Sequence, residues 1–194
     1  MSAVLLKSFG QPPFDRKDIL RYMGCKDADG EISKLLDSCL EEIKDKLSYN
    51  VCYCELDVKI TADECDFGLF RVTSSSLAQY LTGCKKAVVF AATVGVLLDR
   101  LISRYSKISP SRAFVINAIG TQQIEGLCDL FCESMEKGGS MKFRFSAGYG
   151  DLPLEAQKDI FNILGCSKKI GLTLNDSLVM SPSKSVTAFL RIDK

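Results

Sequence analysis

The stretch AVVFAA (residues 87–92) is apolar at every position and is followed by the turn sequence TVG (residues 93–95). A short apolar run of this kind is typical of a central β-strand that is buried on both faces. The longest apolar run of the chain, from Ala87 to Leu98, covers twelve residues, whereas a transmembrane helix needs about 20. The N-terminus has no signal-peptide pattern. We therefore expect a soluble, cytoplasmic protein that is built around this strand.

Helices and strands are predicted on both sides of the central strand. Before it, the spacing of apolar residues predicts a short helix ended by Gly24, a helix from Asp29 to Leu47, a strand from Cys52 to Ile60, a strand from Asp66 to Val72 and a capped helix through Tyr80. After it, the same signals predict a helix from Val96 to Tyr105, a helix from Ser109 to about Lys137, a strand from Met141 to Phe145, a helix from Leu154 to Leu164 and a β-rich tail from Ile170 to Ile192. This order favours one α+β domain over residues 1–194, with a mixed or antiparallel twisted sheet flanked by helices.

The charge balance excludes several classes of partner and of chemistry. The 194 residues include 25 basic and 24 acidic side chains, which leaves a net charge of +1. We therefore expect neither a nucleic acid nor a membrane as partner. The chain has no histidine, which excludes Ser-His-Asp and Cys-His nucleophile pairs and any zinc site that needs imidazole. We expect no metal site.

Nine cysteines are distributed over the chain. Cys52 and Cys54 share one face of a predicted strand, and Cys128 and Cys132 share one face of a predicted helix. Neither spacing matches a zinc or iron–sulfur pattern. The plain interpretation is that the cysteines are small buried hydrophobic residues in a reducing compartment, and the sequence does not assign them another role.

The segment RFSAGYGDLP (residues 144–153) carries the most chemical information. Gly148 and Gly150 allow a ligand to approach the backbone, and Tyr149 lies between them on a loop. The planar fork of Arg144 suits a carboxylate, and the start of the next helix offers amide donors. These groups fit an amino-acid-like or nucleoside-like ligand, and the aromatic face favours a sulfonium or ammonium cation. The glycines also fit a plain strand–turn–helix connection, and local chemistry leaves both interpretations open.

A longer pattern links this segment to a known family. The stretch from Arg144 to Phe189 resembles the C-terminal activation (reactivation) domain of cobalamin-dependent methionine synthase, whose hallmark is R-x-x-x-G-Y, a helix, and then I/T-G-x-x-L-T-E-S-x-x-M-x-P-x-x-S-V-S. The matching positions are Arg144, Gly148, Tyr149, Gly171, Leu174, Ser177, Met180, Pro182, Ser185 and Val186. Residues 86–192 match best, and residues 1–80 resemble only the small stand-alone members of the family.

The resemblance implies the family's fold and a role in methionine biosynthesis. A domain of this family binds S-adenosylmethionine in a shallow site and docks on the cobalamin-binding core of methionine synthase. A flavodoxin-like donor supplies an electron to inactive cob(II)alamin, and S-adenosylmethionine supplies the methyl group that restores methylcobalamin. Such a protein is a component of a methyltransferase, because the cofactors carry the chemistry.

The resemblance also assigns roles to particular residues. The cofactor-binding candidates are Arg144, Ser146, Ala147, Gly148, Tyr149 and Glu125. Arg144 would bind the carboxylate region of S-adenosylmethionine, and the backbone of Ser146 and Ala147 would add contacts. Tyr149 would face the cobalamin, which makes it the candidate catalytic residue. Glu125 matches an acidic position of the family, and its role is open.

Three features depart from the family pattern. The family's G-Y-P-A-C-P is G-Y-G-D-L-P here, and its T-E-S is Asn-Asp-Ser at residues 175–177. An acidic ligand contact near the N-terminus of the full-length enzymes has no secure counterpart here among the four nearby acids, which are Asp15, Asp18, Asp27 and Asp29. We expect Asp151, in the altered loop, to be a helix-start residue and not an acid catalyst.

Two hypotheses follow from the sequence. The first is a stand-alone activation subunit that acts in trans on a methionine synthase core. The alternative is a non-catalytic binding or regulatory module that docks on a corrinoid protein without methyl transfer.

Overall fold

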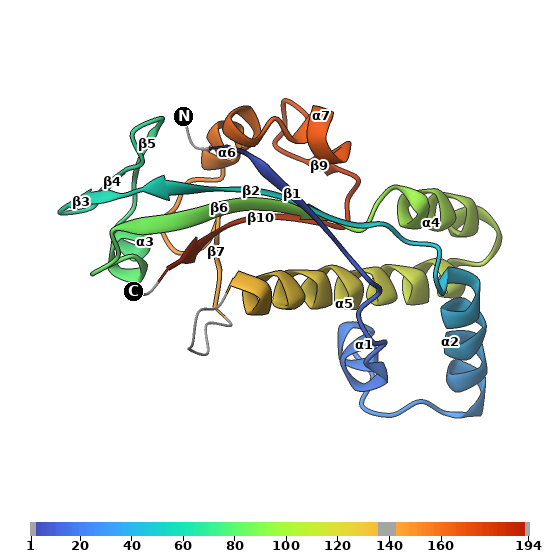
Figure 1. Cartoon of the computed structure of the whole chain (residues 1–194). Coiled ribbons are helices and arrows are strands. Elements are labelled where there is room, and N and C mark those ends of the chain that lie inside the picture. The colour runs from blue at the N-terminus through green and yellow to red at the C-terminus, as the bar shows by residue number, and fades with distance from the viewer. Residues whose placement is uncertain (1–2, 136–142, 193–194) are drawn as a thin grey trace.

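The centre of the computed structural model, which describes residues 3–135 and 143–192, is an antiparallel five-stranded sheet (Figure 1). Its strand order is β1-β2-β6-β10-β7. The central strand β6 (Lys86–Thr93) pairs with β2 (Tyr49–Asp57) and with β10 (Ser185–Arg191), while β1 (Leu5–Phe9) and β7 (Phe145–Ser146) lie at the edges. Every residue of β6 after the first is buried. The prediction of a central strand with two buried faces is therefore confirmed.

Helices cover both faces of this sheet. The first face packs on α5 (Pro110–Met135) and its neighbours α1 (Arg16–Tyr22), α2 (Gly30–Ile43) and α4 (Leu97–Ile108). The second face packs on α6 (Ala156–Leu164), α7 (Cys166–Ile170) and α3 (Ser75–Tyr80). Short strands complete the structure in two small sheets: β3 (Lys59–Thr61), β4 (Glu64–Asp66) and β5 (Arg71–Thr73), then β8 (Thr173–Leu174) and β9 (Met180–Ser181). The predicted α+β class with an antiparallel sheet flanked by helices is confirmed.

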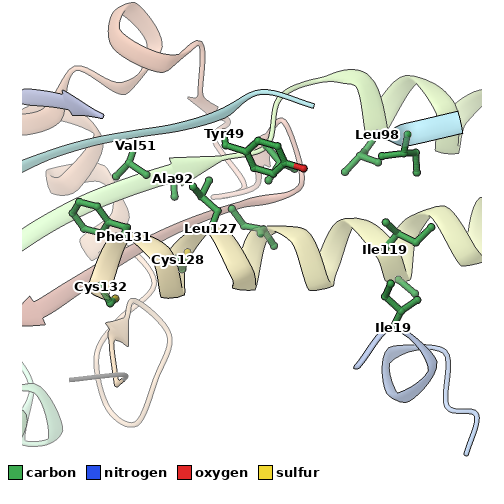
Figure 2. Close-up of a cluster of buried hydrophobic side chains, with 14 of the residues drawn as sticks. Ile19, Tyr49, Val51, Ala92, Leu98, Ile119, Leu127, Cys128, Phe131 and Cys132 are labelled. Carbon is green, nitrogen blue, oxygen red and sulfur yellow. The ribbon is translucent and has the colours of Figure 1, made fainter. Parts of the chain in front are cut away.

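Alternation along β6 divides the interior into two cores. Val88 and Phe90 point toward α5, whereas Val89 points toward α6 and α7. In the first core, the rings of Phe90 and Phe131 lie 4.7 Å apart between centroids. Figure 2 shows Phe131 and the neighbouring residues of α5 directly below β2 and β6. Burial of large apolar side chains on both faces, each worth about 1.5–3 kcal/mol, holds the three layers together.

Two predicted boundaries were wrong because of local turns. The helix predicted to reach Leu47 ends at Ile43, where Lys44 leaves the helical conformation and Asp45 takes a φ of 58°. The strand predicted from Asp66 to Val72 is a hairpin of β4 and β5. Gly68, at a φ of 78°, makes its turn, and its N–H donates to Asp66 Oδ1 over 2.7 Å.

Other predicted elements were shorter or divided. The strand predicted from Cys52 to Ile60 is divided at Val58 between β2 and β3. Only Phe145 of the strand predicted from Met141 to Phe145 lies in β7, and residues 141–142 lie outside the described residues, as do the last two predicted for the long helix, 136–137. The tail has strands at β8, β9 and β10, as predicted. Among the helices that the structure describes, we find none with the length and apolar character to cross a membrane.

Candidate functional site

The acidic groove is a cleft of about 290 Å³ between α5 and the chain that leads into and through α1. On α5, its lining residues recur every three or four positions and therefore share one face of the helix. The groove is lined by Gln122, Glu125, Gly126, Asp129, Leu130 and Glu133 from α5, and by Pro12, Pro13, Asp15, Asp18 and Tyr22 from the other wall.

The position of α1 follows from its cap and its apolar anchor. The side chain of Asp15 accepts hydrogen bonds from the N–H groups of Lys17 and Asp18 at 2.9 and 3.1 Å, and so caps the helix. Ile19 is fully buried and lies against α5 below Ile119 (Figure 2). This packing turns Asp15 and Asp18 toward the face of α5 that carries the acids.

Buried amides fix the proline wall of the groove. Gln122 Nε2 donates to the carbonyl of Pro13 over 3.2 Å, and Gln123 Nε2 donates to that of Pro12 over 3.3 Å. Gln123 Oε1 in turn accepts a hydrogen bond of 2.5 Å from the hydroxyl of Tyr49 on β2. A Cβ at Gly126 would lie 2.9 Å from Pro12 Cβ, so this glycine allows the wall to touch the helix.

Arg144 contacts two of the acids that line the groove. Its guanidinium donates to Asp129 Oδ1 over 2.8 Å and to a carboxylate oxygen of Glu125. Only 12% of its side chain is exposed. Burial is the largest effect and opposes the charge, but the interactions with Cys128, Asp129 and Glu125 together outweigh it and raise the pKa of Arg144, so the guanidinium stays charged.

The charges of the groove favour a cationic ligand. Five carboxylates line it, and the nearby guanidinium groups are Arg144 and Arg21, whose Nε lies 3.1 Å from Asp18 Oδ1. Acids therefore outnumber these bases. A recess with such a surplus concentrates a negative field and attracts cations.

The loop after β7 presents Tyr149 on another part of the surface. Tyr149 is 52% exposed, and its ring packs on Phe145 at 6.1 Å between centroids. Phe145 belongs to the core on the α6 side of the sheet. The turn is closed by the N–H of Gly148, which donates to the carbonyl of Leu152 over 2.9 Å.

Asp151 fastens this loop to α3. Its carboxylate accepts hydrogen bonds from Ser74 Oγ at 2.5 Å and from the N–H groups of Ser75 and Ser76 at 2.8 and 3.0 Å. The hydrogen bond from Ser74 is the largest cause that holds the pKa of Asp151 below its ordinary value, and the two amides add to it. Asp151 is thus at a helix start, but that helix is α3 and not the one that follows it in sequence. A Cβ at Gly150 would lie 2.6 Å from Ser76 Oγ, so this contact requires a glycine.

The structure brings together some of the predicted site residues and separates others. Arg144 and Glu125 are in contact, whereas Tyr149 packs toward the other face of the sheet. Ser146 is half-buried in β7, and Ala147 is buried beside Gly148. Of the N-terminal acids, Asp15 and Asp18 line the groove, while Asp29 caps α2. Sequence reasoning missed Asp129, although it is one helical turn after Glu125.

We looked among the described residues for grouped side chains that could hold a metal ion and found none. The groove offers carboxylates with a guanidinium beside them. Such groups bind and orient a charged ligand.

The molecule thus belongs to the class of α+β domains with an antiparallel sheet between two helical layers, with an acidic groove on one of them. More particularly, its fold is similar to that of a solved structure described as the MetH reactivation domain bound to AdoHcy, with a TM-score of 0.74. The match covers 98% of this chain and 78% of that chain at 12% sequence identity, so it establishes the fold. No protein-family model and no curated protein matches the sequence.

Proposed function

We propose that this protein is an activation module that binds S-adenosylmethionine in the acidic groove and docks on a cobalamin-binding protein, where it supports reductive methylation of the cobalamin. The observation that carries the proposal is the groove itself, because Arg144 and acids from two distant parts of the chain meet there. The structural neighbour was solved with AdoHcy, which lacks only the transferable methyl group of this ligand.

The groups of the groove fit the charges of S-adenosylmethionine. Its sulfonium and ammonium groups are cations, and Asp15, Asp18 and Glu133 offer carboxylates to them. Its carboxylate needs a cation, and Arg144, which contacts the groove acids Glu125 and Asp129, has several N–H donors. Glu125 and Asp129 hold that guanidinium in place, so they orient the donor and add to the field.

The exposed aromatic surface fits the docking step. Tyr149 and Phe143 are 52% and 62% exposed, and Phe145 lies between them in the row of rings. Exposed aromatic side chains are common in binding surfaces. The cobalamin of the partner supplies the methyl-accepting metal, and Tyr149 would cover it and exclude water. A flavodoxin-like protein would supply the electron.

The first test is ligand binding by the full chain. Titration calorimetry with S-adenosylmethionine and S-adenosylhomocysteine is expected to show binding that Glu125→Gln and Asp129→Asn each weaken about tenfold or more, since a charge-assisted hydrogen bond contributes about 1.5–3 kcal/mol. The matched control is Glu55→Gln, which changes an exposed glutamate on β2. Absence of binding, or equal weakening by the control, would contradict the groove as the site.

A second titration isolates the role of Arg144. Methylthioadenosine has no carboxylate, so wild-type protein is expected to bind it more weakly than S-adenosylhomocysteine. In Arg144→Met this difference is expected to vanish if Arg144 binds the ligand carboxylate. If Arg144 only holds Glu125 and Asp129 in place, both ligands lose affinity by the same factor.

A reconstitution tests the activation step. The protein is mixed with a methionine synthase core held as cob(II)alamin, a one-electron donor and methyl-labelled S-adenosylmethionine. Label transfer is expected with the wild type and is expected to fail with Tyr149→Ala, which leaves ligand binding intact. Normal transfer with Tyr149→Ala would remove that residue from the docked site.

One observation favours the second candidate function, a binding module without methyl transfer. The guanidinium of Arg144 is already engaged by two acids of its own chain, while the aromatic surface stays open to a partner. Such a module would bind the corrinoid protein with the same affinity in the presence and absence of S-adenosylmethionine, and it would transfer no label.

A further inference from the structure

Two buried thiols meet on the face of the sheet that lies opposite the acidic groove. Cys52 lies on β2 and Cys166 is the first residue of α7, which packs on that strand. Their Sγ atoms are 3.9 Å apart, and both side chains are in the core formed with α6 and α7. Distant segments of the chain thus place two sulfur atoms in contact.

The surroundings give the two thiols different protonation behaviour. The hydrogen bond with Cys166 lowers the pKa of Cys52, burial opposes this shift, and backbone amides and the charge of Lys169 add to it. The same hydrogen bond raises the pKa of Cys166, and burial raises it further. The hydrogen bond thus favours the charged form of Cys52 over that of Cys166. A thiolate beside a protonated thiol is the arrangement that oxidation to a disulfide uses.

A cleft reaches Cys166, the outer member of this pair, from the surface, while Cys52 lies fully buried behind it. The cleft has a volume of about 710 Å³ and lies between α6, α7 and the turn after β8, with Cys166 in its wall beside Phe161 and Lys168. A small oxidant is far smaller than this cleft. By contrast, burial raises the pKa of Cys65 to about 11, and the thiol of Cys65 has no second sulfur among its hydrogen-bond partners.

We propose that Cys52 and Cys166 form a redox-active dithiol that a hydroperoxide converts to a disulfide. The Cys52 thiolate takes the proton of Cys166 through the hydrogen bond between them, and the sulfur of Cys166, which borders the cleft, attacks the terminal oxygen of the peroxide. The O–O bond breaks, and the leaving oxygen takes up a proton, as water when the oxidant is hydrogen peroxide. Cys166 is then a sulfenic acid. The sulfur of Cys52 attacks the sulfur of Cys166, the S–S bond forms, the S–O bond breaks, and the hydroxyl leaves with the proton of Cys52 as water. The dithiol loses two electrons and the peroxide gains them.

The disulfide would change the α6–α7 side of the molecule. The sulfur atoms must approach from 3.9 Å to about 2.05 Å, so α7 moves toward β2. The bond joins segments far apart in the chain, and such a cross-link restricts the unfolded state. Oxidation is therefore expected to raise the melting temperature by roughly 5–15 °C, and a dithiol reductant is expected to reverse it.

Peptide mapping of the wild-type chain is the first test. The reduced protein is treated with hydrogen peroxide at one equivalent, alkylated, digested without reductant and analysed by mass spectrometry. The expected product is a peptide containing Cys52 linked to one containing Cys166, with two thiols lost per peroxide. A cross-link between other cysteines, or oxidation of single cysteines without a cross-link, would overturn the proposal.

Thermal unfolding of matched variants is the second test. Cys52→Ala and Cys166→Ala are expected to lose both the cross-link and the peroxide-dependent rise in melting temperature. Cys65→Ala removes another buried thiol and is expected to keep both. A rise that persists in Cys52→Ala would show that the effect comes from elsewhere. The mapping of the wild type needs no variant, so a variant that fails to fold leaves the first test decisive.

Discussion

Arg144 and Asp151 lie at the two ends of one loop, and each is a charged residue held by several hydrogen bonds. The partners of Arg144 are two carboxylates that line an open groove. The partners of Asp151 are a hydroxyl and two amides at the start of α3. The first arrangement places charge where a ligand has access, whereas the second satisfies a helix end. A charged residue in a glycine-containing loop therefore indicates a ligand-binding site only when its hydrogen-bond partners line an open groove.

The largest loss in the free energy of unfolding is expected when both ion pairs of Arg144 are removed. In the double variant Glu125→Gln/Asp129→Asn, a guanidinium with 12% of its side chain exposed loses both counterions. Loss of a buried charge's partner costs about 3–5 kcal/mol, and the exposed partners here reduce this to about 2–4 kcal/mol. Urea denaturation followed by circular dichroism measures the difference. The control Glu55→Gln is expected to be neutral, and a neutral double variant would show that water replaces both acids.

The second largest effect is expected from a substitution at the Asp151 end of the loop. It is expected to lower the free energy of unfolding without changing ligand affinity. Gly150→Ala places a Cβ against Ser76 at a positive φ of 55°, which costs about 1–3 kcal/mol. The acidic groove does not include this contact, so affinity for S-adenosylmethionine is expected to stay unchanged at temperatures where the variant is folded. Urea denaturation and calorimetry on the same sample test both parts. Lost affinity in a folded Gly150→Ala would mean that the two ends of the loop are coupled.

A smaller effect, on stability and on ligand affinity, is expected at the buried hydrogen bond between Tyr49 and Gln123 that supports the proline wall of the groove. Tyr49→Phe removes the hydroxyl that donates to Gln123, and a buried hydrogen bond contributes about 1 kcal/mol. Because Gln123 also holds Pro12, the proline wall loosens, and affinity for S-adenosylmethionine is expected to fall about two- to fivefold, less than one factor of ten. Tyr53→Phe, on the same strand, is the control. Equal losses in both variants would show a general effect of removing a hydroxyl.

The sequence predicted the features that depend on neighbouring residues. The central strand at β6 and the helices α1, α5 and α6 follow from runs of apolar residues and their spacing. The hairpin at Gly68 was missed because a turn inside an apolar stretch depends on one glycine and one aspartate. The acidic groove required long-range information. Nothing local distinguishes Asp15 from Asp29, since both cap helices, and only the packing of Ile19 on α5 brings Asp15 to the groove.

The family resemblance and the structure contribute different parts of the site. The motif identified Arg144, a separate upstream match to the family identified Glu125, and the structure shows the two residues in contact. The resemblance grouped Tyr149 with them, but this residue packs on Phe145 toward the other face of the sheet. Arg144 precedes β7 and Tyr149 lies in the turn that follows it, and of the two only Arg144 contacts acids that line the groove.

The last effect is expected for Asp151→Asn, and its pH dependence identifies it. The pKa of Asp151 is lowered in the folded protein, whereas an unfolded aspartate has a pKa of about 3.9. Its contribution to stability is therefore complete above about pH 5 and is lost as the pH falls below about 4 toward the lower folded pKa. The free energy of unfolding of the wild type is expected to fall more steeply over this range than that of Asp151→Asn, and the two curves are expected to converge in acid. Urea denaturation at pH 7, 4 and 2.5 measures this, with Asp57→Asn as the control. Parallel curves would mean that the hydrogen bonds at α3 do not depend on the charge of Asp151, and the contrast with Arg144 would then rest on the groove alone.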